Sequence, residues 1–439
     1  MSETAVLPLN DSPSGTLPRF IYNVNPVKTV HIYSSKLTKA RADFSPFAAP
    51  AQYPFVKAPR KLDWKLCTNA MAALLCGTVK PCMSYDYSMT TPHANREDIK
   101  SDLFTRPAPA YAAIDLGTNN CRMLVARPFK DSFRVVDSFS RIVRLGEGVA
   151  AEGRLSEDAI KRTVSALKVC HAKMKARGVQ RIRSVATEAC RRAENGDEFL
   201  ARVKDEAFLD LEAISSQEEA ELTLTGCAPL LDLRQPNALV FDIGGGSTEV
   251  VWIDATHPDG PKARDVISLP HGVVTLTEDF EGHTNAGESY EEIVDLIDRS
   301  LGEFDKRNAI SKAVADNQVQ MLGTSGTVTT LGAMHLQLRR YDRSRVDGLS
   351  LRFDDICDVV SYLGTMDHDQ RLQHPCIGPR RGDLIMAGCA VLDAVCRRWP
   401  VGSLVVADRG IREGILLNLM HEDGHEITST RGAERGAHR

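Results

Sequence analysis

One short stretch, residues 239–252, limits the folds open to this chain more than any other. An apolar run that contains Asp242 is followed by three glycines and two residues with hydroxyl side chains. Glu249 comes next, and a second apolar run follows it. This pattern predicts a β-hairpin whose turn carries no bulk. Three consecutive glycines allow positive φ angles and let backbone N–H groups converge on one point. Such a concavity of amides suits a phosphate group.

A second stretch, residues 111–126, has the same design. An apolar run ends at Asp115, passes through Gly117 and small polar residues, and continues as another apolar run. The two aspartates are 242 − 115 = 127 residues apart, which is close to one domain length. Strands followed by helices between and after these stretches indicate an α/β fold. We therefore expect duplicated domains, each presenting a turn to a shared cleft.

A third turn rich in glycine and hydroxyl groups follows the strand expected at residues 319–322. It lies where that strand passes into a helix, so free N–H groups and the positive end of the helix dipole favour an anion there. The candidate phosphate-binding residues of the three turns are Gly117, Thr118, Asn119, Gly244, Gly245, Gly246, Ser247, Thr248, Ser325, Gly326 and Thr327.

Carboxylates and arginines stand beside these turns. Asp115, Asp242 and Glu249 are the candidate ligands of a Mg²⁺ ion, because hard cations prefer carboxylate oxygens. Arg122 and Arg191 are candidate phosphate ligands, since a guanidinium suits bidentate phosphate recognition. Other arginines form either a track for a longer polyanion or an exposed basic face. These are Arg339, Arg340, Arg343, Arg345, Arg380 and Arg381.

Glu219 admits two interpretations. Ser216 and Glu219 have the S-x-x-E spacing of a capping box at a helix start, which would explain the glutamate without any catalytic role. The same carboxylate, at a helix start beside the expected cleft, is also the candidate general base that takes a proton from water. The spacing alone is compatible with both.

Composition excludes several classes of protein. A net charge of −4 with 43% hydrophobic residues argues against a dedicated nucleic-acid binder. The 11 cysteines are scattered without CxxC pairs, so we expect neither a zinc site nor disulfides, and a cytoplasmic location. No apolar run approaches the roughly 18 residues of a membrane span. Residues 1–108, with 11 of the 21 prolines, are expected to be a disordered tail, as are residues 422–439. The domains between them are predicted at 109–235 and 236–421.

A set of motifs appears in a fixed order along residues 110–420. They are Asp115 to Asn119 with Arg122, residues 144–148, 186–191, 216–220, 242–249, 323–327 and 409–414. In combination they resemble the exopolyphosphatase/guanosine pentaphosphate phosphohydrolase (Ppx/GppA phosphatase) family of the actin and sugar-kinase superfamily. The resemblance implies two ribonuclease-H-like (actin-like ATPase) domains around a central cleft. It also implies Mg²⁺ as cofactor, and removal of the terminal phosphate from inorganic polyphosphate or of the 5′-γ-phosphate from guanosine pentaphosphate.

The resemblance further assigns roles to single residues. Glu219 corresponds to the family's catalytic glutamate and Glu249 to its second essential glutamate. Arg191 corresponds to the phosphate-binding arginine, and Asp242 to the carboxylate near the metal. The chain departs from the family pattern at Glu221, where an arginine is usual. That extra negative charge either disturbs the approach of phosphate or faces solvent.

Two other functions are compatible with the sequence. One is an ATP-dependent phosphotransferase of the same superfamily, and the other is a non-catalytic regulator that binds guanosine penta- or tetraphosphate. For the hydrolase, the expected partner is inorganic polyphosphate or guanosine pentaphosphate. We expect no nucleic acid and no membrane as partner, and a homodimer as the assembly.

Overall fold

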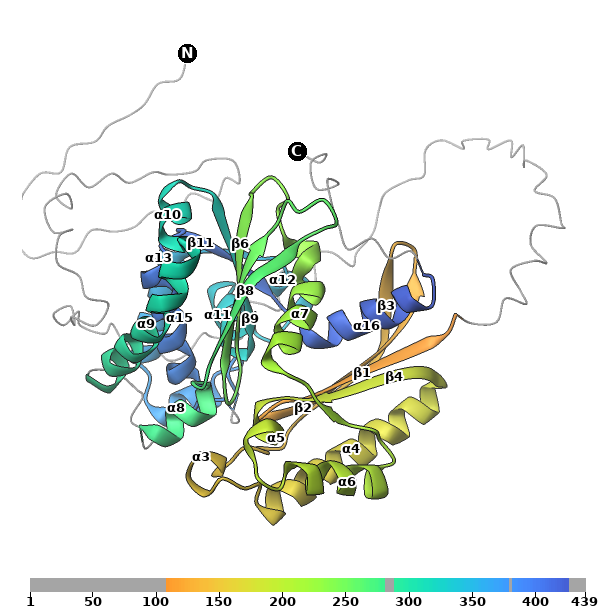
Figure 1. Ribbon diagram of the computed structural model, residues 1–439. Coiled ribbons are helices and arrows are strands. Elements are labelled where there is room, and N and C mark those ends of the chain that lie inside the picture. Colours follow the sequence, from red (N-terminus) through yellow and green to blue (C-terminus); the bar gives the residue numbers. More distant parts are fainter. Residues whose placement is uncertain (1–107, 281–287, 379–380, 426–439) are drawn as a thin grey trace, which may run out of the picture. The chain divides into compact units, whose positions relative to one another are not determined.

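A computed structural model describes residues 108–280, 288–378 and 381–425 (Figure 1). The described residues all belong to one compact unit of the chain. The predicted tail at 1–108 therefore lies outside the described residues except for its last residue, and so does residue 380 of the arginine set. Of the predicted C-terminal tail, residues 422–425 are described, and Asp423 accepts a hydrogen bond of 2.7 Å from the Tyr111 hydroxyl.

The first sheet has the strand order β3-β2-β1-β4-β5. Strands β1, β2 and β3 pair antiparallel, whereas β4 pairs parallel with both β1 and β5. The strands are β1 (Ala110–Leu116), β2 (Asn120–Phe129), β3 (Ser132–Ile142), β4 (Val179–Ala186) and β5 (Glu212–Ala213).

The second sheet repeats this arrangement in the order β10-β11-β9-β6-β7-β8. Its antiparallel β6, β7 and β8 correspond to β1, β2 and β3, and β9 and β11 continue it in parallel, as β4 and β5 do in the first sheet. The strands are β6 (Asn237–Ile243), β7 (Thr248–Asp254), β8 (Lys262–Leu269), β9 (Val319–Ser325), β10 (Ser350–Arg352) and β11 (Ser403–Ala407). The predicted α/β fold with two duplicated units is confirmed.

Several helices begin and end at residues whose type favours a helix terminus. In α4 the Ser156 hydroxyl accepts a hydrogen bond from the Ala159 amide at 3.2 Å, and Gly178 ends the helix with a φ of 64°. The helices of the first half are α3 (Val149–Glu152), α4 (Glu157–Arg177), α5 (Glu188–Arg192), α6 (Gly196–Ala207) and α7 (Ser216–Cys227), followed by the 3₁₀ turn η3 (Ala228–Leu230). The second half contains α8 (Val273–Asp279), α9 (Glu288–Asn308), α10 (Ile310–Ala315), α11 (Gly326–His335), α12 (Arg343–Val346), α13 (Phe353–Gly364), α14 (His368–Gln373), α15 (Ile385–Arg398) and α16 (Ile411–Glu422).

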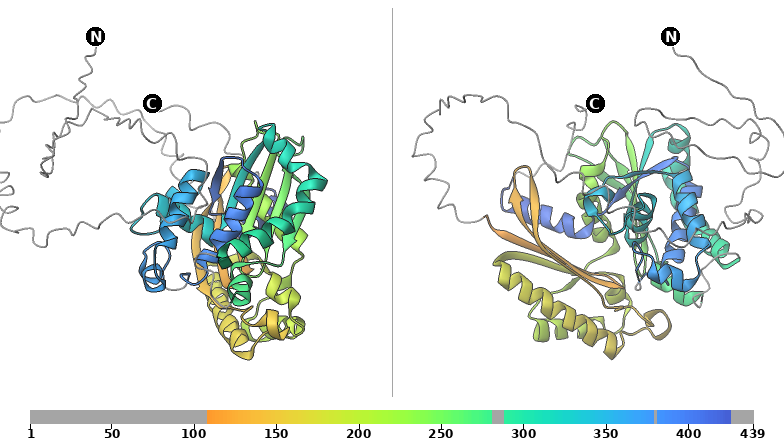
Figure 2. Two further views of the ribbon diagram at one scale, coloured as in Figure 1. Left: turned by 90° about the vertical axis from the view of Figure 1, so that its left-hand side faces the viewer. Right: turned by 180° about the vertical axis from the view of Figure 1, so that it is seen from behind.

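Strand β1, in the middle of the first sheet, is buried on both faces, which explains why it is apolar almost throughout. Alternate residues of β1 point to opposite faces, so Ala112 and Ile114 join the core under α4 and α6. Tyr111 and Ala113 join a second core formed with α16. Figure 2 shows the sheet between these helices, with α16 in blue and α4 in yellow.

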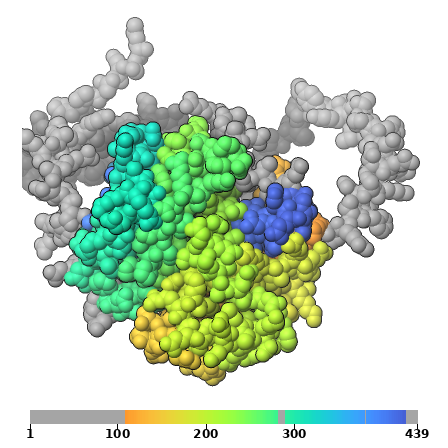
Figure 3. Space-filling view, viewed as in Figure 1, coloured from red at the N-terminus to blue at the C-terminus, as the bar shows by residue number. Residues whose placement is uncertain are grey.

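Two helices cover the sheet of the opposite half of the chain. Helix α7, from the first half, packs with the second sheet, and α16, at the end of the second half, packs with the first. Figure 3 shows α16, in blue, lying against residues of the first half. The two helices touch at glycines, because a Cβ on Gly226 would collide with the Gly410 backbone and one on Gly414 with Leu222. The predicted division at residue 235 stays a prediction, and the helices near it exchange sheets.

Candidate active site

The two hairpin turns are in direct contact. A Cβ added to Gly245 would lie 3.1 Å from Thr118 Cβ and 3.2 Å from the Asn119 amide nitrogen. One added to Gly246 would lie 2.6 Å from the Thr118 hydroxyl. These glycines do not use the positive φ angles that glycine allows, since residues 244–246 are absent from the positive-φ glycines of the described chain. Glycine is required here because one turn packs against the other.

Neighbouring backbone groups hold both turns. The Gly146 amide donates to the Thr118 carbonyl at 2.9 Å, so the 144–148 motif supports the first turn. At the second turn, the amides of Val273 and Val274 donate to the Gly244 and Gly245 carbonyls at 3.0 and 2.8 Å. These bonds draw the carbonyls toward α8. They leave the opposite side of the peptides, where the amides are, for an anion.

The third turn joins the other two around one pocket. Ser325 caps α11, and its hydroxyl accepts a hydrogen bond from the Val328 amide at 3.1 Å. We call the space between the turns the inner pocket, with a volume of about 120 Å³. It is lined by Asp115, Gly117, Thr118, Asn119, Asn120, Arg122, Thr187, Glu219, Asp242, Ile243, Gly244, Gly245, Gly246, Ser247, Val273, Ser325, Gly326, Thr327, Arg381, Leu384, Ile385 and Ile411.

Three of these lining residues are carboxylates. Burial raises the pKa of Asp115, against the opposing charges of Arg122 and Arg412. Burial, followed by the negative charge of Glu249, raises the pKa of Asp242 to about 7. The same two causes raise the pKa of Glu219 well above its ordinary value, while Arg191 opposes the rise. The pocket thus concentrates negative charge that water does not screen.

Glu249 and Thr248 lie behind the pocket and do not line it. Glu249 stands opposite Asp242 in the β6–β7 ladder, and its carboxylate accepts a hydrogen bond of 2.8 Å from Ser268 on β8. Burial raises the pKa of Glu249, although hydrogen bonds from Ser247 and Ser268 oppose the rise. Thr248 is fully buried, and its hydroxyl donates to the His271 carbonyl at 2.7 Å. The structure therefore gives Thr248 no access to a ligand in the inner pocket.

Glu219 does not cap its helix. The N-cap of α7 is Ser215, whose hydroxyl accepts from the Glu218 amide at 3.1 Å, so the capping box predicted for Ser216 and Glu219 is wrong. The Glu219 carboxylate instead accepts a hydrogen bond of 2.9 Å from Arg191 and lies in the inner pocket. Of the two interpretations of Glu219, the one that places it in the active site remains.

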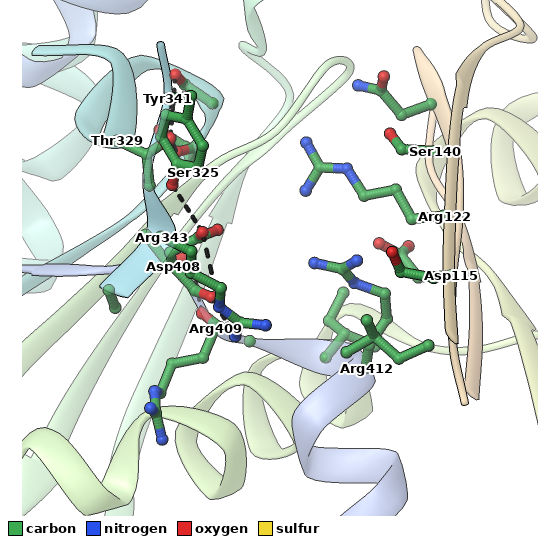
Figure 4. A pocket seen from close by; sticks show the side chains of 18 of the residues that line it. Asp115, Arg122, Ser140, Ser325, Thr329, Tyr341, Arg343, Asp408, Arg409 and Arg412 are labelled. Atoms are coloured by element: carbon green, nitrogen blue, oxygen red, sulfur yellow. Dashed lines mark hydrogen bonds and ion pairs between the residues drawn. The ribbon is translucent and has the colours of Figure 1, made fainter. Parts of the chain in front are cut away.

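A larger space, which we call the outer chamber, adjoins the inner pocket and has a volume of about 900 Å³. The two share Asp115, Asn120, Arg122, Asp242, Ser325, Gly326, Arg381 and Ile411. Figure 4 shows Arg122 and Asp115 on one wall of the chamber, with Tyr341 and Ser325 across from them. The rest of its lining is Leu124, Val135, Ser138, Phe139, Ser140, Ile142, Thr324, Thr329, Tyr341, Arg343, Cys376, Ile377, Gly378, Ala407, Asp408, Arg409, Gly410 and Arg412.

The arginines of the outer chamber differ in their partners. Arg343 donates to Glu413 at 2.7 Å, and Arg409 is held by Asp347. Arg381 donates to the Thr330 hydroxyl at 3.2 Å. For the described part of the chain, no carboxylate lies within ion-pair distance of Arg122 or Arg412. Cationic groups available to an anionic ligand therefore gather where the chamber meets the inner pocket.

This geometry agrees with the comparisons with known proteins. The model of the Ppx/GppA phosphatase family matches residues 124–423. The chain belongs to this family. It is 30% identical to exopolyphosphatase 2 of Mycobacterium tuberculosis, over 70% of this chain and 98% of that protein. Such relatives identify this member of the Ppx/GppA family as a phosphoanhydride hydrolase.

Two further similarities extend this result. The crystal structure of the Aquifex aeolicus Ppx/GppA family member shares 30% identity and a TM-score of 0.60, covering 73% of this chain and 100% of that one. It supports the two-domain actin-like fold. The chain is also 27% identical to a bifunctional 3-dehydroquinate synthase/phosphatase of Fusobacterium nucleatum, over 74% of this chain. It spans 50% of the length of that relative.

Sequence reasoning missed several residues of this phosphatase site. Thr187 and Arg412 line its cavities, Ser268 holds Glu249, and Glu188 pairs with Arg191. Arg412 lies in the 409–414 motif, where sequence reasoning assigned it no separate role, whereas Arg381 of the predicted arginine set does line both cavities. Of that set, Arg343 also reaches the chamber, whereas Arg339, Arg340 and Arg345 are exposed outside it.

Two further predictions concern the charge at residue 221 and the membrane. Glu221 is exposed, accepts a hydrogen bond of 2.9 Å from Gln217, and lines neither cavity of the phosphatase. The sequence left open whether the Glu221 charge disturbs the approach of phosphate or faces solvent. In the structure it faces solvent. Within residues 108–280, 288–378 and 381–425, no helix has the length and apolar character needed to cross a bilayer.

Proposed function

We propose that this protein is a Mg²⁺-dependent hydrolase that releases the terminal phosphate of inorganic polyphosphate, or the 5′-γ-phosphate of guanosine pentaphosphate. The observation that carries the proposal is one pocket lined by three amide-rich turns and by three carboxylates with raised pKa values. Phosphoryl transfer depends on positioning and on neutralising the charge of the transferred group. Turn amides and arginines would position the transferred phosphate and neutralise its charge, and a carboxylate would act as the base.

The residues present fit a Mg²⁺ ion bound together with the substrate. Asp115 and Asp242 place carboxylates in the inner pocket, and the Asn119 side-chain oxygen there is buried without a hydrogen-bond partner among the described residues. No three His, Cys, Asp or Glu side chains of the described chain are grouped closely enough to form a metal cage. Mg²⁺ usually needs no such cage, because it binds through one or two carboxylates, waters and substrate phosphates. Asp115 and Asp242 would hold the ion, with Glu249 behind Asp242.

The bound ion would neutralise charge on the phosphate oxygens and lower the pKa of nearby water. In the proposed reaction, the amides of the three turns orient the terminal phosphate in the inner pocket. Glu219 accepts a proton from the attacking water, since burial makes its carboxylate a stronger base than a solvated one. Arg122, Arg381 and Arg412 balance the charge of the remaining phosphates in the outer chamber. The leaving group departs through that chamber.

A phosphate-release assay tests this function. Polyphosphate, guanosine pentaphosphate and ATP are incubated with the protein, with Mg²⁺ or with EDTA. We expect Mg²⁺-dependent phosphate release from one or both of the first two substrates, and little from ATP. Release that persists in EDTA would contradict the metal requirement. Phosphate transfer from ATP to an added alcohol, without release from polyphosphate, would instead support a phosphotransferase. The predicted homodimer and cytoplasmic location stay predictions.

A further inference from the structure

Arg191 is surrounded by acceptors that belong to the protein. Its Nη1 donates to the Ile214 carbonyl at 2.7 Å and to Glu219 Oε2 at 2.9 Å, and its Nη2 donates to Glu188 Oε2 at 2.8 Å. All three side chains are largely buried, with exposed fractions of 18% for Arg191, 15% for Glu188 and 10% for Glu219. A guanidinium held at three points by buried acceptors has a fixed position.

The cavities place the two partners of this ion pair differently. Glu219 lines the inner pocket, whereas Arg191 lines neither the inner pocket nor the outer chamber. The arginine therefore contacts Glu219 from outside the pocket that would hold the phosphate. Ile214 directly precedes the N-cap of α7, so the same guanidinium also fixes the start of the helix that carries Glu219.

Glu188 is the anchor of this arrangement. It is the first residue of α5, where a carboxylate is favoured by the helix dipole, and Arg191 lies one turn later on the same helix. A Cβ on Gly246 would lie 3.1 Å from Glu188 Cγ, so Glu188 packs against the second phosphate turn. Glu188 thus links the turn that would hold the phosphate to the arginine that holds Glu219.

We propose that Glu188 and Arg191 are positioning residues that present the Glu219 carboxylate to the attacking water, with Arg191 acting on Glu219 and not on the substrate. This inference rests on the proposed function, because it assigns both residues a role in that reaction. It replaces the phosphate-binding role that the sequence suggested for Arg191. It also gives Glu188 a role that its sequence position alone did not indicate.

The Glu188→Gln variant separates the two roles through kcat and KM. Glutamine keeps the size of the side chain but weakens its hold on Arg191. For a positioning pair, kcat falls by about tenfold while KM stays within about twofold, because misplaced catalytic groups slow the chemical step. For a phosphate ligand, Arg191 would be released toward the substrate, and kcat would be unchanged. That second result would overturn the proposal. Glu198→Gln, an exposed carboxylate on α6, is the matched control and leaves both constants unchanged.

A double-mutant cycle asks whether Glu188 acts through Glu219. If it does, adding Glu188→Gln to a Glu219→Gln variant lowers the residual rate by less than twofold, although it costs about tenfold in the wild type. A further tenfold loss in the double variant would show an independent action and overturn the proposal. Thermal unfolding of each variant establishes that the rates are those of folded protein.

A binding measurement keeps this inference separate from the proposed function. The affinity for tripolyphosphate is measured by calorimetry in the Glu219→Gln background, with and without Arg191→Lys. A positioning arginine leaves the dissociation constant within about twofold, whereas loss of a phosphate ligand weakens it by about tenfold or more. The second outcome overturns the inference whether or not the wild type hydrolyses polyphosphate. Absence of phosphate release from every substrate by the wild type would overturn the proposed function, and this inference with it.

Discussion

Asp242 and Glu249 occupy directly opposed positions of the β6–β7 ladder, so a partly exposed and a buried carboxylate share one face of the second sheet. Residues opposed in this way have Cβ atoms about 4.5–5.5 Å apart. Burial of the Asp242 carboxyl group, together with the nearby negative charge of Glu249, raises the pKa of Asp242 to about 7. The hairpin turn contacts the first hairpin, which brings the charge of Asp115 to bear on the same group.

This relationship predicts how stability depends on pH in metal-free buffer. Asp242 holds its proton more tightly in the folded state, so its stabilising contribution is complete below the unfolded pKa of 3.8 and is lost as pH rises through about 7. The gap corresponds to about 4 kcal/mol at most. We expect Tm in EDTA to fall between pH 5 and 8, and Asp242→Asn to flatten this decline. A Tm that falls equally steeply in the variant would contradict the assignment.

We expect bound Mg²⁺ to restore the stability that ionisation of these carboxylates removes. At pH 8, a concentration of 100 times the dissociation constant would stabilise the protein by about 2.7 kcal/mol, provided that the unfolded chain does not bind the ion. Differential scanning fluorimetry with and without Mg²⁺ measures this shift. An Asp115→Asn/Asp242→Asn double variant should lose it. Asp232→Asn, at an exposed ion pair with Arg234 that lines neither cavity, should keep it. An equal shift in both would place the ion elsewhere.

Replacing the proposed base should abolish most activity without harming the fold. We expect Glu219→Gln to lower phosphate release by at least about 10²-fold, since general-base catalysis contributes 10²- to 10⁴-fold. Its Tm should change little, because the change removes a repelled charge along with a salt bridge. Glu221→Gln, two residues away on the exposed face of α7, is the control and should retain full activity. A nearly wild-type rate for Glu219→Gln would remove this residue from the mechanism.

The contact between the two turns should tolerate no side chain at Gly246. An alanine there would place a methyl group 2.6 Å from the Thr118 hydroxyl, so both turns must move. We expect kcat/KM to fall by about 10²-fold, because errors of about 1 Å in position can cost that much. Gly302→Ala is the control, since nothing lies within 4 Å of its added methyl group in α9. It should stabilise the helix by up to about 1 kcal/mol and leave activity unchanged.

Arg412 should matter more for long substrates than for short ones. It lines only the outer chamber, where phosphates beyond the scissile anhydride would lie. Losing a charged hydrogen-bond donor costs about 1.5–3 kcal/mol, so Arg412→Gln should raise KM for long polyphosphate by about tenfold or more. The effect on tripolyphosphate should be smaller. Arg345→Gln, which alters an exposed arginine outside both cavities, should change neither value. Equal effects on all chain lengths would contradict this placement.

The sequence predicted the fold well because its signals are local. Alternating burial, the cap at Ser156 and the stop at Gly178 each depend on neighbouring residues, and the repeated hairpin indicated the duplication. Glu219 shows the limit of such signals. A helix start displaced by one residue, from Ser216 to Ser215 as N-cap, changes which glutamate is available for capping.

The unpredicted parts of the site depend on contacts between distant segments. Ser268 faces Glu249 only because β8 pairs with β7 in a particular register. Arg412 reaches the chamber because α16 lies on the first sheet, which no periodicity in its own sequence reveals. The glycines 244–246 were predicted for their freedom of φ, whereas the contact with Thr118 explains them. Such reasons exist only in the folded molecule.

The exchange of α7 and α16 between the sheets has a consequence for attempts to dissect the protein. A fragment ending at residue 235 would keep α7 but lose α16, leaving the face that contains Tyr111 and Ala113 open to water. The complementary fragment would lack α7 and expose Ala238 and Val240. Each half expressed alone would expose a large apolar surface and would aggregate. The two halves must therefore be expressed, and must evolve, as one cooperative folding unit.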